Sequence, residues 1–281
     1  MTRIRKVYIS LVLLIVLITV VCLIIINQFG TFNFENSQMV SKLVSNTHAK
    51  YDYTGQNIKI AVIDSGIMDT HSDFGENIKV GYNFILDTTD TFDFNGHGTH
   101  VSGVIAAQDN EIGIKGIAPK AEIYPLLVLN EEGKGEISDV CEAISWCINN
   151  KIDIINLSFS TKKNDSNLKE VIDKATLAGI VVIASYNNDV QVHSYPAEYE
   201  NVIGVKAHDK DLISFNDGIV YAPGKRVATT NIDGSYVYVD GNSIAAAYVA
   251  GFAALVKENY QNKGGDFDID ALYSVINNIG N

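Results

Sequence analysis

Short apolar runs recur along the chain beyond residue 57, separated by polar or amphipathic stretches. They are rich in Val, Ile and Ala and show little alternation with polar residues, which is typical of strands buried on both faces of a sheet. The sequence therefore predicts a set of buried strands. The runs are residues 58–63, 121–128, 153–158, 180–185 and 201–207.

Two of the intervening stretches carry apolar residues at the spacing of an amphipathic helix. They cover residues 137–150 and 167–179, and the second ends at Gly179, a residue that commonly follows a helix C-terminus. Alternating strands and helices predict an α/β domain with a parallel sheet and helices on both of its faces. In such a sheet, functional groups gather at the carboxyl ends of the strands.

The beginning of the chain has a different character. Residues 7–26 form an apolar run without a charge, long enough to cross a bilayer as a helix. Three basic residues lie within 1–6, and the next basic residue is Lys42. This asymmetry predicts a cytoplasmic N-terminus. We therefore expect a single-pass signal anchor in the cell membrane, followed by a connector at 27–52 and an extracytoplasmic domain at 53–281.

A cleaved signal peptide is the alternative, and it would make the protein secreted. It is less favoured because the apolar run is long and no small-x-small cleavage pattern precedes Asn27. Within the connector, residues 38–45 have a short helical pattern.

Composition narrows the class of partner. The 281 residues suffice for one large domain, which we expect to be a monomer, and the net charge of -12 argues against nucleic-acid binding. Cys22 lies in the apolar run, while Cys141 and Cys147 are on one predicted helix and point in different directions. The cysteines are therefore expected to be free thiols rather than a disulfide framework.

Three polar residues beside glycines carry the candidate chemistry. Asp64 follows the 58–63 run, His97 opens a small-residue helix, and Ser243 opens an Ala-rich helix. A serine becomes a nucleophile when a histidine takes its proton, and a carboxylate fixes the tautomer of that histidine. The three residue types thus form a possible acid, base and nucleophile.

Each of these residues also has an ordinary structural explanation. An aspartate after a strand or a serine at a helix start is often only a cap. His100, three residues after His97, suggests a metal site, but neither an HExxH pattern nor a cysteine cluster accompanies it. We expect His100 to be structural.

The segments IAVIDSGI, NGHGTHVSGV and DGNSIAAAYVAG, in the order Asp, His, Ser, resemble those of subtilisin-like serine peptidases. The resemblance implies a subtilisin-like fold and a serine endopeptidase that acts on polypeptides without an organic cofactor. Ser243 would attack, His97 would relay the proton and Asp64 would orient His97. Asn188, in GIVVIASYNND, would hold the oxyanion with the Ser243 N–H.

The resemblance also implies an extended substrate cleft. Two segments would pair with the substrate backbone as added strands: Gly133, Lys134 and Gly135, and Ser158, Phe159 and Ser160. The pocket for the residue before the cut would be walled by Ser185, Tyr186 and Asn187, with Ser194 near its base. Because these positions include no carboxylate, we expect a small or medium uncharged residue before the cut.

Several positions depart from the family pattern. Asn242 and Ile244 replace Thr and Met around the serine, and Ala247 replaces a proline. Ser160 and Asn187 stand where the family has glycine, so they add side chains to the cleft. This favours a selective processing protease. The alternatives are a catalytically silent subtilisin-like binding protein and, further off, an anchored solute-binding protein.

A calcium site is a further implication of the resemblance. Residues 108–114, QDNEIGI, resemble the family's calcium loop. Oxygen ligands suit calcium, and a metal-free turn is the alternative. The side chains of Asp73 and Asn110 and the carbonyls of Gln108, Ile112 and Ile114 would be the ligands.

Overall fold

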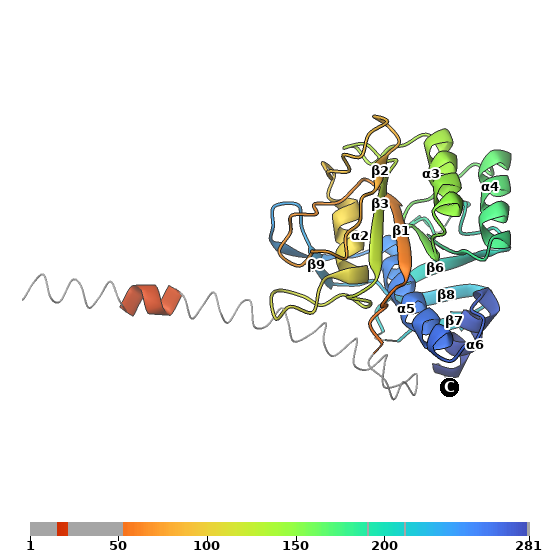
Figure 1. Cartoon of the computed structure of the whole chain (residues 1–281). Helices are drawn as coiled ribbons and strands as arrows, with labels where there is room; N and C mark the ends of the chain where they lie inside the picture. The colour runs from red at the N-terminus through yellow and green to blue at the C-terminus, as the bar shows by residue number, and fades with distance from the viewer. Residues whose placement is uncertain (1–15, 22–52, 190, 211, 280–281) are drawn as a thin grey trace, which may run out of the picture.

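The computed structural model describes residues 16–21, 53–189, 191–210 and 212–279 (Figure 1). Residues 16–21 are helical and exposed. The predicted connector, its helical stretch and most of the predicted anchor lie outside the described residues. Within the described part of the chain, no helix is both long enough and apolar enough to span a membrane.

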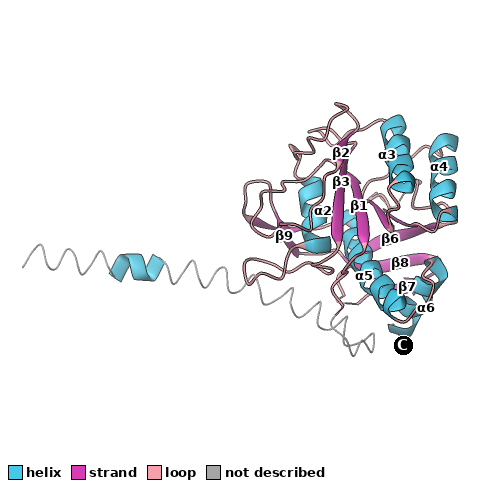
Figure 2. Cartoon of the chain, in the orientation of Figure 1, coloured by secondary structure: helices cyan, strands magenta, loops and turns pink. Residues whose placement is uncertain are grey.

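An eight-stranded sheet forms the centre of the molecule, in the order β2-β3-β1-β4-β5-β6-β8-β7 (Figure 2). Neighbouring strands are parallel except for β7 and β8. The five predicted apolar runs are confirmed as β1, β3, β4, β5 and β6. The strands are β1 Lys59–Asp64, β2 Tyr82–Asn83, β3 Glu122–Leu127, β4 Ile154–Leu157, β5 Val181–Ser185, β6 Val202–His208, β7 Ser214–Asn216 and β8 Ile219–Pro223. A separate antiparallel pair joins β9 Val227–Thr230 to β10 Tyr236–Val239.

Helices cover both faces of the sheet, as predicted. The helices α2 (His97–Ala106) and α5 (Asn242–Asn262) share one apolar core, and α3 (Ile137–Asn149) and α4 (Ser166–Leu177) share the other. Figure 2 shows α3 and α4 side by side, well away from α2. The last helix, α6 (Ile269–Ile279), packs beside β7 and α5.

Small residues explain how α5 packs so deeply. Its residues from Ile244 to Val256 are buried. A Cβ atom added at Gly251 would lie 2.6 Å from the Cβ of Ile117, so this position has no room for a larger residue. The Ala- and Gly-rich sequence therefore seats α5 against the sheet, and its first turn carries Ser243.

The two cysteines that the structure describes are free, as expected. Cys147 is buried in the core, where burial raises the pKa of its thiol, and Cys141 is partly exposed. Cys22 lies outside the described residues.

The strand order places the candidate residues together. From β1 the sheet continues to β3 on one side and to β4 on the other. This is the kind of switch point at which α/β sheets form their sites. Asp64 ends β1, and residues 158–160 and 185–187 lie at the carboxyl ends of β4 and β5.

Candidate active site

Asp64 and His97 form a hydrogen-bonded pair. The Nδ1 atom of His97 lies 2.8 Å from Oδ1 and 3.0 Å from Oδ2 of Asp64, which is completely buried. The N–H of Ser65 donates to the same Oδ1 at 2.8 Å. Because a carboxylate accepts, Nδ1 carries the proton, and Nε2 is left as the acceptor that a general base requires.

The pair also sets the electrostatics of the imidazole. The negative charge of Asp64 raises the pKa of His97, although burial acts in the opposite direction. The side chain of His97 is 34% exposed, so the ring can be reached by a substrate. His97 can therefore take up a proton that the buried carboxylate then stabilises.

Asp93 holds the turn that leads into α2. Its Oδ1 accepts hydrogen bonds from the N–H groups of Asn95 and Gly96, and its Oδ2 accepts from the N–H and the hydroxyl of Thr99. Asp93 is completely buried, and Gly96, at φ 97°, has no side chain with which to cap the helix. The sequence reasoning missed Asp93. The only feature of the sequence that indicated this role was an acidic residue three positions before Gly96, the N-cap of α2.

Close packing and a second histidine surround the pair. A Cβ added at Gly98 would lie 2.2 Å from the carbonyl oxygen of Gly66, so the backbone of α2 approaches the end of β1 closely and this position has no room for a side chain. His100 lies 3.3 Å from Oδ1 of Asn231, and burial lowers its pKa. Among the described residues, no group of three or more His, Cys, Asp or Glu side chains could hold a metal.

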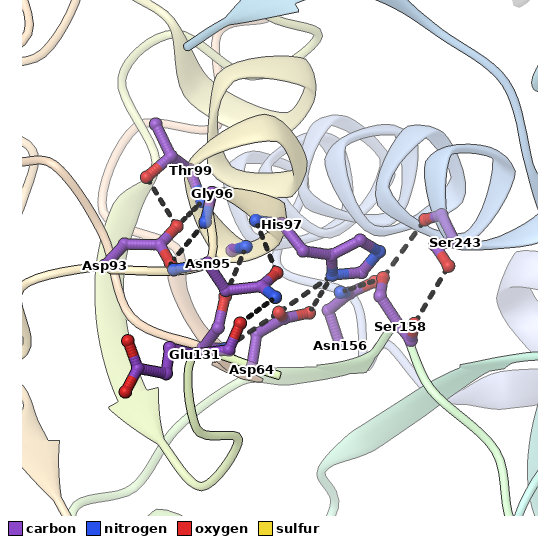
Figure 3. A network of polar contacts seen from close by, with 12 residues as sticks. Asp64, Asp93, Asn95, Gly96, His97, Thr99, Glu131, Asn156, Ser158 and Ser243 are labelled. Atoms are coloured by element: carbon purple, nitrogen blue, oxygen red, sulfur yellow. Dashed lines mark hydrogen bonds and ion pairs between the residues drawn. The ribbon is translucent and has the colours of Figure 1, made fainter. Parts of the chain in front are cut away.

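Ser243 lies in the first turn of α5, and its hydroxyl is already engaged. The hydroxyl donates to the carbonyl of Ser158 at 2.9 Å and forms no hydrogen bond with His97 (Figure 3). In return, the Ser158 hydroxyl donates to the Ser243 carbonyl at 3.0 Å and accepts from Asn156 at 2.8 Å. To donate to His97, the Ser243 hydroxyl would have to give up its hydrogen bond to the Ser158 carbonyl.

Asn188 is exposed, and its orientation is fixed. Its Oδ1 accepts a hydrogen bond from the backbone N–H of Asn242 at 3.1 Å. Its Nδ2 makes no hydrogen bond to the described residues and is free to donate. The N–H of Ser243 lies in the first turn of a helix, where amides have no intrahelical acceptor. The hydrogen bond from Asn242 holds Asn188 beside the start of the helix that carries Ser243.

A model of the Subtilase family matches residues 55–274, which include every candidate site residue. The chain belongs to the subtilase family. It is 40% identical over 212 residues to Subtilisin BL of Lederbergia lenta, covering 73% of this chain and 78% of the relative. It is 37% identical over 239 residues to Subtilisin DY of Bacillus licheniformis, covering 81% and 86%.

A solved structure supports the same assignment. The crystal structure of a cold adapted subtilisin-like serine proteinase has a TM-score of 0.68 and 25% identity, covering 80% of this chain and 83% of that one. This subtilase is accordingly a serine endopeptidase with the subtilisin-like α/β fold, and the fold class predicted for its domain is confirmed.

The first predicted cleft segment of the subtilase lies beside the His97 loop. Gly133, Lys134 and Gly135 are exposed. Asn130 closes the turn that holds them, because its N–H donates to the Lys134 carbonyl and its Oδ1 accepts from the Lys134 N–H. The Asn95 side chain donates to the carbonyl of Glu131 at 2.9 Å. These contacts join the turn before the segment to the loop that carries His97.

The residues predicted to form the second cleft segment and the pocket lie together in the subtilase. Ser158 and Ser185 are buried where they leave adjacent strands, and Ser194 is buried with its hydroxyl accepting from the Asn187 N–H at 3.0 Å. Phe159 and Tyr186 are partly buried and pack against the core that contains α3 and α4. Ser160 and Asn187, which replace glycines, are hydrogen-bonded to each other.

The predicted calcium ligands also gather at one place. Asp73 accepts from the N–H of Ile114 at its Oδ2 and from the N–H of Gln108 at its carbonyl. Asn110 contacts Ser72 and the N–H of Ile112. Asp73 is completely buried, and burial raises its pKa, while the nearby Tyr236 hydroxyl and Asn110 side chain act in the opposite direction; its Oδ1 accepts no hydrogen bond of normal geometry from the described residues. A buried carboxylate oxygen without such a hydrogen bond fits a cation.

Proposed function

We propose that this subtilase cleaves selected polypeptides by nucleophilic catalysis with Ser243, His97 and Asp64. The observation that carries the proposal is the buried Asp64 carboxylate bonded to Nδ1 of His97, with Ser243 at the adjoining helix start. The Asp64–His97 pair supports the role of His97 as the base, and the position of Ser243 in the first turn of α5 supports its role as the nucleophile.

The residues act in a fixed order. The Ser243 hydroxyl leaves the Ser158 carbonyl, loses its proton to Nε2 of His97 and attacks the substrate carbonyl. Asp64 stabilises the resulting imidazolium. Nδ2 of Asn188 and the N–H of Ser243 donate to the oxyanion. His97 then gives its proton to the leaving amine, and water releases the acyl group by the same route.

A fluorophosphonate probe tests this assignment because it reacts with an activated serine and needs no known substrate. We expect the full chain to be labelled and Ser243→Ala to be unlabelled at an unchanged melting temperature. Ser145→Ala is the matched control, since Ser145 is another helical serine whose hydroxyl bonds a backbone carbonyl. Absence of labelling on folded wild-type protein would favour the silent binding protein instead.

The apolar run at 7–26 and the basic residues before it support a location at the membrane. We place residues 1–6 in the cytoplasm and the catalytic domain outside, where substrates emerging from the membrane would be met first. Protease added to spheroplasts should digest the catalytic domain. A domain recovered from the medium with its N-terminus beyond residue 26 would favour secretion after signal cleavage.

Calcium is the metal that the loop at 108–114 is suited to hold. The Oδ1 of Asp73 would be one ligand, and Asn110 and the carbonyls of Gln108, Ile112 and Ile114 would complete an all-oxygen set. Bound calcium would stabilise the loop that follows α2 and would take no part in the chemistry.

A further inference from the structure

A hydrogen bond connects the predicted wall of the pocket for the residue before the cut to the neighbouring predicted cleft segment, and these two segments are called the two walls below. Nδ2 of Asn187 donates to Oγ of Ser160 at 3.2 Å. The other end of the same amide is also used, because its Oδ1 accepts from the N–H of Asp189 at 2.8 Å. The Asn187 amide is therefore held at both ends and cannot turn aside without losing a bond.

Backbone hydrogen bonds also join the two walls, on both sides of the Ser160–Asn187 bond. The two walls leave adjacent parallel strands, in which Leu157 is paired with Ala184. At the far end, Thr161 and Tyr195 exchange backbone hydrogen bonds of 2.8 and 2.9 Å. The Asn187 N–H bonds to Ser194 at the predicted pocket base. The Ser160–Asn187 bond thus joins two walls whose separation the backbone already limits.

We propose that Ser160 and Asn187 form a latch that restricts the substrates of this enzyme to polypeptides with glycine or alanine immediately before the scissile bond. This inference rests on the proposed function and specifies its substrate class. Glycine at both positions would leave the space between the walls open. The two side chains, bonded together, would instead occupy that space.

A large substrate side chain would have to break the latch and displace both groups. It would leave the Asn187 amide and the Ser160 hydroxyl without their partners, and an apolar side chain cannot replace those bonds. A hydrogen atom or a methyl group needs no such displacement. The latch therefore selects by size, and its polar atoms make the selection sharper than an apolar pocket of the same volume would.

The test is a set of peptides that differ only in the residue before the cut. We expect the wild type to cleave after Ala or Gly on the order of 100-fold more efficiently, in kcat/KM, than after Phe. The Ser160→Gly/Asn187→Gly double variant should lose this preference and gain activity on Phe. Each single variant should give much of the effect, because either change breaks the same bond.

Two conservative variants separate the effect of the Ser160–Asn187 hydrogen bond from the effect of side-chain volume. Ser160→Thr keeps the accepting hydroxyl and should keep the preference, whereas Ser160→Ala keeps most of the volume and should relax it. Asn150→Gly is the remote control, because it removes an exposed asparagine that bonds only within its own helix end. Its preference should match the wild type.

Fluorophosphonate labelling distinguishes the two possible failures. If the wild type is labelled but cleaves after Phe as well as after Ala, the latch is overturned while the proposed function stands. The same holds if the double variant is labelled and its preference is unchanged. If folded wild type is not labelled at all, the proposed function fails and the latch fails with it.

Discussion

The backbone N–H of Asn242 donates to the side-chain oxygen of Asn188 at 3.1 Å, and the Asn242 side chain holds the segment just before Asn188. Its Nδ2 donates to the carbonyls of Tyr186 and Asn187, both at 3.1 Å, and its Oδ1 accepts from the N–H of Ala207 at 2.8 Å. Asn242 therefore ties the predicted oxyanion donor to the start of the helix that carries the nucleophile.

Replacing Asn242 by Ala should lower kcat on the order of 10-fold and change KM little. The reason is that loss of one oxyanion donor costs about 10²–10³ in kcat, a magnitude measured on subtilisin itself, and misplacing the donor should cost part of that. Steady-state kinetics on one peptide checks it. In an Asn188→Ala background the same change should have little further effect, since both act through one amide. Additive losses would contradict this.

The sheet and the three central residues could be predicted from the sequence because each leaves a local signal. Continuous apolar runs indicate β1 and β3 to β6, and Asp64, His97 and Ser243 each lie beside glycines at the start or end of an element. The strands β2, β7 and β8 of this sheet were not predicted, nor was the separate pair β9 and β10. With two and three residues, β2 and β7 are too short to show a pattern, and β8, with the sequence IVYAP, is not a continuous run of Val, Ile and Ala.

The supporting contacts could not be predicted for a different physical reason. Asn242 stood out only as a departure from a family pattern, and nothing local shows that its amide reaches Ala207 in β6. The Ser243 hydroxyl bonds the Ser158 carbonyl, a contact between residues 85 positions apart. Such contacts depend on which strands become neighbours, and that is a property of the assembled sheet.

The acid limb of the kcat/KM profile should have an apparent pKa above the ordinary histidine value of about 6.5. Only neutral His97 can accept the serine proton, and the Asp64 charge raises the pKa of His97, so activity appears as pH rises through that raised value. The contribution of protonated His97 to folding stability changes with pH in the opposite direction. It is fully present below the pKa of the unfolded state and is lost as pH rises through the raised pKa of folded His97.

Asp64→Asn should move this limb to lower pH and reduce kcat by about 10⁴-fold, the scale for neutralising a triad aspartate. A pH series of initial rates checks both effects. His193→Gln is the control, since His193 is an exposed histidine paired with Glu198, and its profile should not move. An acid limb that stayed in place in Asp64→Asn would exclude Asp64 as the cause of the shift.

Calcium should raise the melting temperature in step with its concentration. A ligand that binds only the folded state contributes about 2.7 kcal/mol at 100 times its Kd. Asp73→Asn should abolish the response, because it removes the buried carboxylate. Asp109→Asn, a neighbour in the same loop paired with Lys115 on the surface, should retain it. Identical melting curves with calcium and with chelator would contradict the site.

Asp93→Ala should destabilise the fold by about 2–4 kcal/mol, because it removes a helix cap and leaves several N–H groups without an acceptor. Asp93 is completely buried and accepts from two donors in the turn before His97 and from two donors of Thr99 in α2. Asp93→Asn should cost less, since its side-chain oxygen can still accept from Gly96. Denaturant unfolding gives the change in free energy.

Activity per folded molecule separates the role of Asp93 from plain destabilisation. Asp165 caps α4 through the N–H groups of Asn167 and Leu168, and α4 carries no candidate site residue. Asp165→Ala should therefore lose about 1 kcal/mol of stability and no activity per folded molecule. Asp93→Ala should lose both stability and activity per folded molecule, because the turn that Asp93 holds sets the orientation of the His97 side chain. Full activity in the folded fraction of Asp93→Ala would reduce Asp93 to a stability residue.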